Sequence, residues 1–422
     1  MRMPAIITFF LCVSALLFPF SVAATNAALG VFLGLGIVSG LWWQGAKHCW
    51  ENYRLLSVIL SAYLILVVFG LLWTLDFRWG LHVLGRHWFW LLLPVAVSIL
   101  GETKARRLFL LSLSSGLTLN LVYCVMQMYG YVEVTTGGSN AEDATGHIGH
   151  IGFGLVYGIW AAWLLHLGLI REGRLRLIFW GLAAWSYVMV FSAQGRSGYL
   201  IAIALMLCVL YKWVFDLKSW KVIIPVSVGC LIVVLAIGIG PGKERLQGTW
   251  QALTQKHELK SASSLDNTDY AFLATLERFY MWKTSIEIWQ KQPLLGVGTG
   301  GLPHAVSDLK SGFRLTENIT VAESFAHPHN QYILNLTRWG PAGVILLLAL
   351  LSVWMREGFK VDWQHSVVAP LSTLSGLALA LHALSSSSME EHFSAILAVL
   401  LLATAMSVSS ENSRSTGGSD EI

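Results

Sequence analysis

The segment Leu55–Leu75, LLSVILSAYLILVVFGLLWTL, decides the fold class because it carries no charged residue. A helix that crosses the hydrocarbon core of a bilayer needs about 20 mostly apolar residues, and this segment is long enough. The whole chain has the same character: of its 422 residues, 55% are hydrophobic, 12% are charged and 19 are tryptophan. One soluble core could not use that proportion of apolar side chains. The sequence therefore predicts an all-α, polytopic membrane protein.

Similar apolar stretches recur along the chain and predict about 12 transmembrane helices. The first stretch follows Arg2 and ends near Ala23, a pattern that also resembles a cleavable signal peptide. Because the next apolar stretch follows at once, we expect an uncleaved first helix. The predicted spans lie near 5–23, 26–44, 55–75, 88–101, 107–129, 151–170, 177–193, 199–215, 222–240, 331–355, 366–386 and 392–409.

The basic residues of the short loops predict the orientation, because such residues collect on the cytoplasmic side. If the N-terminus is cytoplasmic, most of them lie inside, and the external short loops hold only Arg78, Arg86 and Arg196. Both termini are then cytoplasmic. The predicted domains are transmembrane helices 1–9 in residues 1–240, one large external loop with amphipathic helices in 241–330, helices 10–12 in 331–409 and a cytoplasmic tail in 410–422.

An arginine stands alone on the external side, in the stretch Ser192–Gly198 between the seventh and eighth predicted spans. A charged group at membrane depth is costly unless it is paired. Arg196 could be an anchor that extends to the interface. It could also be a fork-shaped donor to phosphate oxygens, with Gly195 and Gly198 letting the backbone approach an anion.

A second arginine opens a predicted amphipathic helix over Glu277–Lys291, inside the external loop. Apolar residues recur there at spacings of three or four, which is typical of a helix that lies flat on a bilayer surface: Leu276, Phe279, Trp282, Ile286 and Trp289. Arg278 could contact headgroups or a substrate phosphate. The glycine-rich stretch Gln292–Gly301 follows. It lacks the Lys-Ser/Thr of a Walker phosphate loop and predicts a tight turn.

The third motif is His327-Pro328-His329-Asn330-Gln331-Tyr332, where the polar loop re-enters an apolar stretch. Pro328 suits the first turn of a helix, so His329 is expected at a helix start, where anions bind. A histidine exchanges a proton near neutral pH. It could instead be a hydrogen-bonded interfacial side chain. His327, His329, His304 and Glu323 could also bind a metal, but their spacing matches no zinc signature, so we predict neither a metal nor a cofactor.

Taken in order, the three motifs resemble the O-antigen ligase and polymerase superfamily. Length and a single large loop late in the chain are most similar to the lipopolysaccharide O-antigen ligases. The resemblance implies a GT-C-like fold and a metal-independent, inverting glycosyltransferase. Its donor would be a glycan on undecaprenyl pyrophosphate, and its acceptor a sugar hydroxyl of lipid A-core, at the periplasmic face of a bacterial inner membrane.

The resemblance also implies the site residues. Arg196 and Arg278 match essential arginines that bind substrate, and His329 matches an essential histidine, so these three are the expected catalytic residues. His327 is a further expected substrate contact. The stretch Thr337–Pro341 departs from the acidic-Gly-Leu sequence expected there, which puts a carboxylate at that place in doubt.

Three other functions stay open at this point. An O-antigen polymerase would use the same donor with a second carrier-linked glycan as acceptor. A protein O-oligosaccharyltransferase shares the motif order, usually on a longer chain. A transporter would account for about 12 helices, but it would need charged groups and broken helices near the bilayer midplane, whereas here the charges gather at the external edge.

Overall fold

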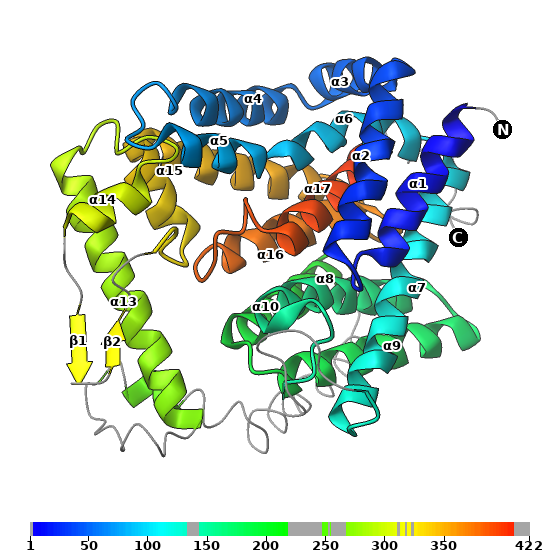
Figure 1. The fold of residues 1–422 in the computed structure, drawn as a ribbon. Helices are drawn as coiled ribbons and strands as arrows, with labels where there is room; N and C mark the ends of the chain where they lie inside the picture. Colours follow the sequence, from blue (N-terminus) through cyan, green and yellow to red (C-terminus); the bar gives the residue numbers. More distant parts are fainter. Residues whose placement is uncertain are drawn as a thin grey trace.

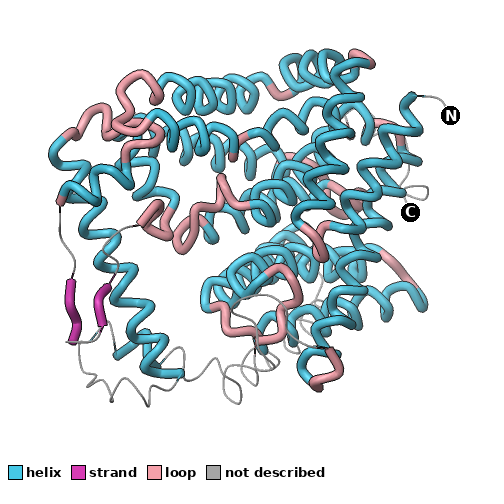
Figure 2. The backbone as a smooth tube through the Cα atoms, in the orientation of Figure 1, coloured by secondary structure: helices cyan, strands magenta, loops and turns pink. Residues whose placement is uncertain are grey.

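The computed structural model describes residues 3–132, 143–217, 247–251, 254, 267–309, 313–316, 319–321 and 325–408. Helices dominate these residues (Figure 2), and two short antiparallel strands, β1 (Phe313–Thr316) and β2 (Ile319–Val321), form one hairpin. The helices are α1 (Met3–Leu17), α2 (Val22–Val38), α3 (Leu41–Asn52), α4 (Arg54–Phe69), α5 (Phe77–Gly85), η1 (Trp88–Leu91), α6 (Leu92–Leu100), α7 (Thr103–Met128), α8 (Gly149–Ile170), α9 (Gly173–Ser192), α10 (Arg196–Leu217), α13 (Asn267–Lys291), α14 (Leu302–Asp308), α15 (Gln331–Phe359), α16 (Ala369–His382) and α17 (His392–Met406).

The helices form several packed groups (Figure 1). One group packs α8 against α9 and α10, and another packs α1 against α2 and α7. The long helix α15 lies against α4 and α16, while α13 packs on α15 and stands with α14 and the hairpin at one side of the molecule. The predicted all-α, polytopic membrane architecture is confirmed.

The described residues confirm only part of the predicted set of about 12 spans. In the described residues, six helical segments are long and apolar enough to cross a bilayer, or up to seven if a bent pair counts as one span. Five of them, α7, α8, α9, α10 and α15, match predicted spans, and the sixth, Phe77–Leu100, extends the one predicted at 88–101. The predicted spans 5–23, 55–75, 366–386 and 392–409 correspond to the shorter helices α1, α4, α16 and α17. The span at 222–240 lies outside the described residues.

The span predicted at 26–44 is wrong as a single helix, because the chain bends by 84° between α2 and α3. Gly40 stands at the break with φ of 77°, a left-handed conformation that glycine adopts without steric cost. The side chain of Ser98 donates a hydrogen bond of 2.8 Å to the carbonyl of Leu41, which holds α3 against α6. An apolar sequence pattern alone does not reveal such a bend.

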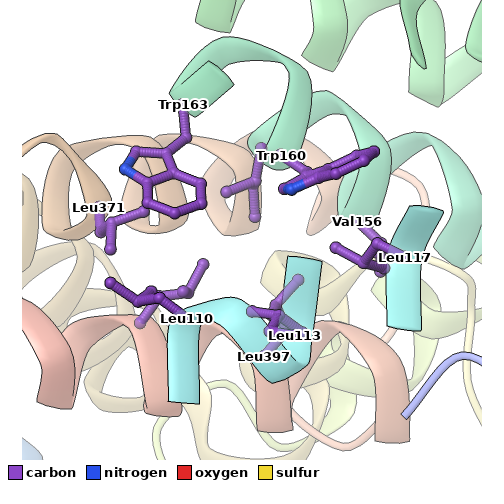
Figure 3. A pocket seen from close by; sticks show the side chains of 10 residues that line it. Leu110, Leu113, Leu117, Val156, Trp160, Trp163, Leu371 and Leu397 are labelled. Carbon is purple, nitrogen blue, oxygen red and sulfur yellow. The ribbon is translucent and has the colours of Figure 1, made fainter. Parts of the chain in front are cut away.

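The core lies around α8, in which every residue from Phe153 to Gly168 is buried inside the protein. Trp160 and Trp163 of this helix face Leu113 of α7 and Leu397 of α17 across a small apolar cavity (Figure 3). The cavity volume is about 10 Å³. That is room for at most one water molecule, and the apolar walls offer it no hydrogen bond. The cavity is a packing gap in the core and not a substrate site.

Candidate active site

The loop before α10 has a fixed shape, which sets the direction of Arg196. The backbone N–H of Gln194 donates a hydrogen bond of 2.9 Å to the buried carboxylate of Asp143. A Cβ at Gly195 would lie 2.5 Å from the carbonyl oxygen of His150, and a Cβ at Gly198 would lie 2.7 Å from Cα of Gly154. These glycines therefore allow α8 and α10 to pack closely. This packing accounts for the two glycines without a bound anion, and their approach to an anion stays a prediction.

Arg196 begins α10 and extends across to α13. Its Nη1 donates a hydrogen bond of 2.7 Å to Oγ1 of Thr275, and another to Oγ1 of Thr249. Thr275 lies one helical turn before Arg278 on the same helix. The structure therefore brings the first two predicted arginines to neighbouring positions, although a long stretch of sequence separates them.

Helix α13 begins at Asn267 and not at Glu277, so Arg278 lies in its middle rather than at its start. Its inner face contains Met281, Ser285 and Ile288, all buried. This face packs on α15, and the hydroxyl of Thr337 in α15 donates a hydrogen bond of 3.2 Å to the carbonyl of Ser285. The helix is thus anchored by protein contacts along one side. Burial lowers the pKa of Arg278, and the neighbouring Glu277 opposes this shift.

The histidine motif is joined directly to α13. Trp282, one turn after Arg278, donates an indole hydrogen bond of 2.9 Å to the carbonyl of Pro328. The rings of His327 and His329 meet edge to face, with centroids 4.5 Å apart. Nδ1 of each ring is buried and has no hydrogen-bond partner among the described residues. Both rings therefore keep a nitrogen atom available for a ligand or a proton.

His329 does not lie on a helix start, contrary to the sequence prediction. Asn330 is the N-cap of α15, and its Oδ1 accepts hydrogen bonds from the backbone N–H groups of Tyr332 and Ile333 at 3.0 and 3.1 Å. His329 precedes the cap with φ of 49°, the one positive φ among the described residues other than glycine. Positive φ is uncommon outside glycine, and residues held in such conformations cluster at functional sites. The asparagine before an apolar run was the available signal for the cap.

The two histidines are electrostatically distinct. Burial, together with the nearby charges of His327 and Arg278, lowers the pKa of His329 to about 4, and Glu391 opposes this shift. Burial also lowers the pKa of His327, where Glu391 and Glu390 oppose the shift while Arg338 and Arg86 add to it. The ring of His329 is thus neutral at pH 7 and can accept a proton. The charge of Arg278 lowers the pKa of His329, and the charge of Arg86 lowers the pKa of His327.

A buried ion pair supports this arrangement and was not foreseen from the sequence. Arg338 of α15 pairs with Glu390 in the turn between α16 and α17, and the two residues are 1% and 7% exposed. Gln331 reinforces the link, because its Oε1 accepts a hydrogen bond of 3.0 Å from the backbone N–H of Met389. The signal in the sequence was Arg338 inside the predicted span 331–355, since a charge there requires a partner.

The glycine-rich turn after α13 docks on a kink in α15. The backbone is not helical at Trp339 and Gly340, and φ of Gly340 is 61°. A Cβ added at Gly340 would lie 2.2 Å from the carbonyl oxygen of Leu294. In the turn, the N–H groups of Val297 and Gly298 donate 2.9 Å hydrogen bonds to the carbonyls that the kink frees. The prediction of a tight turn holds. Its N–H groups bind backbone rather than phosphate.

The remaining metal candidates do not assemble in the part of the chain that the structure describes, where no group of three or more His, Cys, Asp or Glu residues is close enough to hold an ion. His304 lies on α14 and pairs with Asp308 at 3.6 Å. Glu323 lies outside the described residues. Arg196 and Arg278 place two positive charges in this region, beside the rings of His327 and His329.

Comparison with known protein families gives a match over part of the chain. Residues 181–348 match the model of the family described as O-antigen ligase, and this range includes Arg196, Arg278, His327 and His329. No curated protein matches the chain.

Proposed function

The chain belongs to the O-antigen ligase superfamily, a family of glycosyl-transferring enzymes, and from this premise we propose that it is a lipopolysaccharide O-antigen ligase. It transfers a glycan from undecaprenyl pyrophosphate to a sugar hydroxyl of lipid A-core. The site faces the periplasm from the bacterial inner membrane, within a GT-C-like architecture. One observation carries the proposal: separate segments bring two arginines and a neutral histidine to adjoining positions.

The arginines suit a pyrophosphate leaving group. When the bond between the sugar C1 and the pyrophosphate oxygen breaks, the leaving oxygen takes the electron pair and gains negative charge. Donors placed where charge develops stabilise the transition state more than the ground state. Arg196 and Arg278 approach from two helices and can hold opposite sides of a diphosphate, as a divalent ion does in other transferases. The proposed reaction therefore needs no metal.

His329 suits the other half of the reaction. The acceptor hydroxyl forms the new bond to C1, and its proton must leave. A neutral imidazole can accept that proton, and Nδ1 of His329 is buried without a partner among the described residues. The pKa of about 4 belongs to the site without substrate, where Arg278 disfavours the protonated ring. A bound pyrophosphate offsets the charge of Arg278, so donor binding strengthens the base. His327 contacts substrate beside it.

Reconstitution tests the proposal. The purified protein, in vesicles, receives a synthetic undecaprenyl-pyrophosphate glycan and rough-type lipopolysaccharide, with and without chelator. A ligase gives glycan-bearing lipopolysaccharide in both conditions. A product that lengthens on the carrier lipid instead identifies a polymerase, a glycosylated protein identifies a protein oligosaccharyltransferase, and no transfer under any condition contradicts the enzymatic proposal.

A further inference from the structure

A cavity of about 340 Å³, lined by apolar and polar side chains, lies between α2, the end of α5 and the start of α17. Figure 1 shows α5 running past α17 on the side away from α10. Its lining includes Asn26, Gly85, Arg86, Trp88, Glu390 and His392. Glu390 belongs both to this cavity and to the buried pair with Arg338. The cavity is therefore continuous with the framework that supports the histidines.

The lining offers polar atoms that no protein group satisfies. Oδ1 of Asn26 and Nε2 of His392 are buried without a hydrogen-bond partner, and the guanidinium of Arg86 forms no hydrogen bond or ion pair, within the part of the chain that is described. A buried polar atom without a partner costs free energy, so these atoms favour a polar occupant. Arg86 adds a preference for an acidic group, and Trp88 adds an aromatic surface. The volume lies within the usual range for small-molecule sites.

Arg86 in this cavity and Arg278 in α13 lie near different members of the histidine pair. The charge of Arg86 acts on His327, whereas the charge of Arg278 acts on His329. A ligand held by Arg86 would thus lie beside His327, and a pyrophosphate held by Arg278 beside His329. A displacement at a sugar carbon needs two such sites, because nucleophile and leaving group occupy opposite sides of the reacting atom.

We propose that this cavity is the acceptor subsite, which binds one sugar residue of the acceptor saccharide and pairs Arg86 with a phosphate carried on it. The inference rests on the proposed transfer reaction and names its second substrate more closely. Oδ1 of Asn26 accepts a hydrogen bond from one hydroxyl group of the sugar, and Nε2 of His392 forms a hydrogen bond with another. Binding there directs a free hydroxyl toward His327 and His329.

The test measures the KM of each substrate separately, in the reconstituted full-length protein. Arg86→Gln is expected to raise the KM for a phosphorylated acceptor about 10- to 100-fold, the loss of a hydrogen bond to a charged group, and to leave the KM for the donor unchanged. Treating the acceptor with phosphatase should raise the wild-type KM similarly and have little further effect on Arg86→Gln. The matched control is Arg78→Gln, because Arg78 is an exposed arginine on the same helix that does not line the cavity.

A second variant blocks the space itself. Gly85 ends α5, its φ is not left-handed, and a Cβ added there meets no atom within 4 Å. Gly85→Phe should therefore fold normally and raise the acceptor KM whether or not the acceptor carries phosphate. An unchanged acceptor KM in both Arg86→Gln and Gly85→Phe would overturn the subsite, while absence of transfer by the wild-type protein would count against the proposed function instead.

Discussion

Trp282 and Pro328 connect the two halves of the candidate site, because the indole N–H of the first donates a 2.9 Å hydrogen bond to the carbonyl of the second. Trp282 lies one turn after Arg278, and Pro328 lies between the two histidines. The distance between Arg278 and His329 therefore depends on the hydrogen bond between Trp282 and Pro328, in which neither Arg278 nor His329 takes part.

Trp282→Phe is expected to slow transfer at saturating substrate about 10-fold, because it removes the hydrogen bond and keeps most of the ring. Loss of this bond should cost only about 1 kcal/mol of stability, whereas a small displacement of a catalytic group can cost far more in rate. The control is Trp289→Phe on the same helix, where the indole donates a 3.0 Å hydrogen bond to Pro293, away from the histidines. Equal rates for the two variants would show that the Trp282 contact is merely structural.

The arginine assignments make a sharper prediction. Arg196→Ala and Arg278→Ala should each abolish transfer while the protein still expresses and unfolds normally in detergent. Arg196→Lys and Arg278→Lys should recover little activity, because a lysine is a point charge without the bidentate fork of an arginine. The readout is the initial rate of glycan transfer to lipopolysaccharide.

Lys283→Ala provides the control for charge alone. Lys283 is an exposed cation on the same helix and pairs with Glu287 at 3.9 Å. Its loss should leave the rate unchanged. Wild-type rates in both lysine variants would exclude bidentate binding, and wild-type rates in both alanine variants would move the pyrophosphate site elsewhere.

The buried pair of Arg338 and Glu390 should matter chiefly for stability. Glu390→Gln or Arg338→Met leaves one charge buried without its partner, which typically costs about 3–5 kcal/mol. The double variant removes both charges, so its free energy of unfolding should lie closer to wild type than that of either single variant. Denaturant-driven unfolding in mixed micelles measures this. Glu357→Gln, which breaks an exposed pair with Lys360, should change stability by about 1 kcal/mol or less.

Sequence patterns predicted the parts of this protein that depend on local chemistry. Helices α7 to α10 and α15 follow from runs of apolar residues, because each such run must satisfy its own backbone hydrogen bonds in lipid. The kink at Gly340 and the convergence of Arg338 with Glu390 depend on contacts between distant segments. The spacing of apolar residues within one segment does not predict such contacts.

The candidate site shows the same division. Arg196, Arg278 and His329 were identifiable as unusual polar residues beside apolar stretches. Their proximity was not, since it depends on the hydrogen bonds from Arg196 to Thr275 and from Trp282 to Pro328. The packing role of the glycines at 195 and 198 was not identifiable either, because a glycine needed for close helix packing and one that admits an anion look identical in sequence.

The predicted orientation is tested by cysteine labelling in a variant without native cysteines. Gln292 and Arg174 are both exposed, at the end of α13 and at the start of α9. If α13 is periplasmic, Gln292→Cys should react with an impermeant thiol reagent added to cells with a permeabilised outer membrane, and Arg174→Cys should react only after lysis. The reverse pattern would invert the topology and place the site in the cytoplasm.

The role of His329 can be separated from that of a phosphate contact by the pH dependence of kcat/KM, which reports the free enzyme. A base acts in its neutral form, and the pKa of His329 is lowered to about 4. The rate should therefore stay level from about pH 6 to 8 and fall only as the pH drops toward that pKa. A histidine that binds phosphate through a positive charge gives the opposite slope, with activity lost as the pH rises.

Substitutions at His329 and His327 complete this test. A general base supplies about 10²- to 10⁴-fold, so His329→Ala should lose most transfer while still binding the carrier lipid through the arginines. His329→Gln keeps a hydrogen bond but cannot take the proton at neutral pH, so it should be nearly as inactive. His327→Ala should be milder and should mainly raise a substrate KM. Near-normal rates in His329→Gln would assign the proton to another group, and a reversed ranking of the two histidines would make His327 the base.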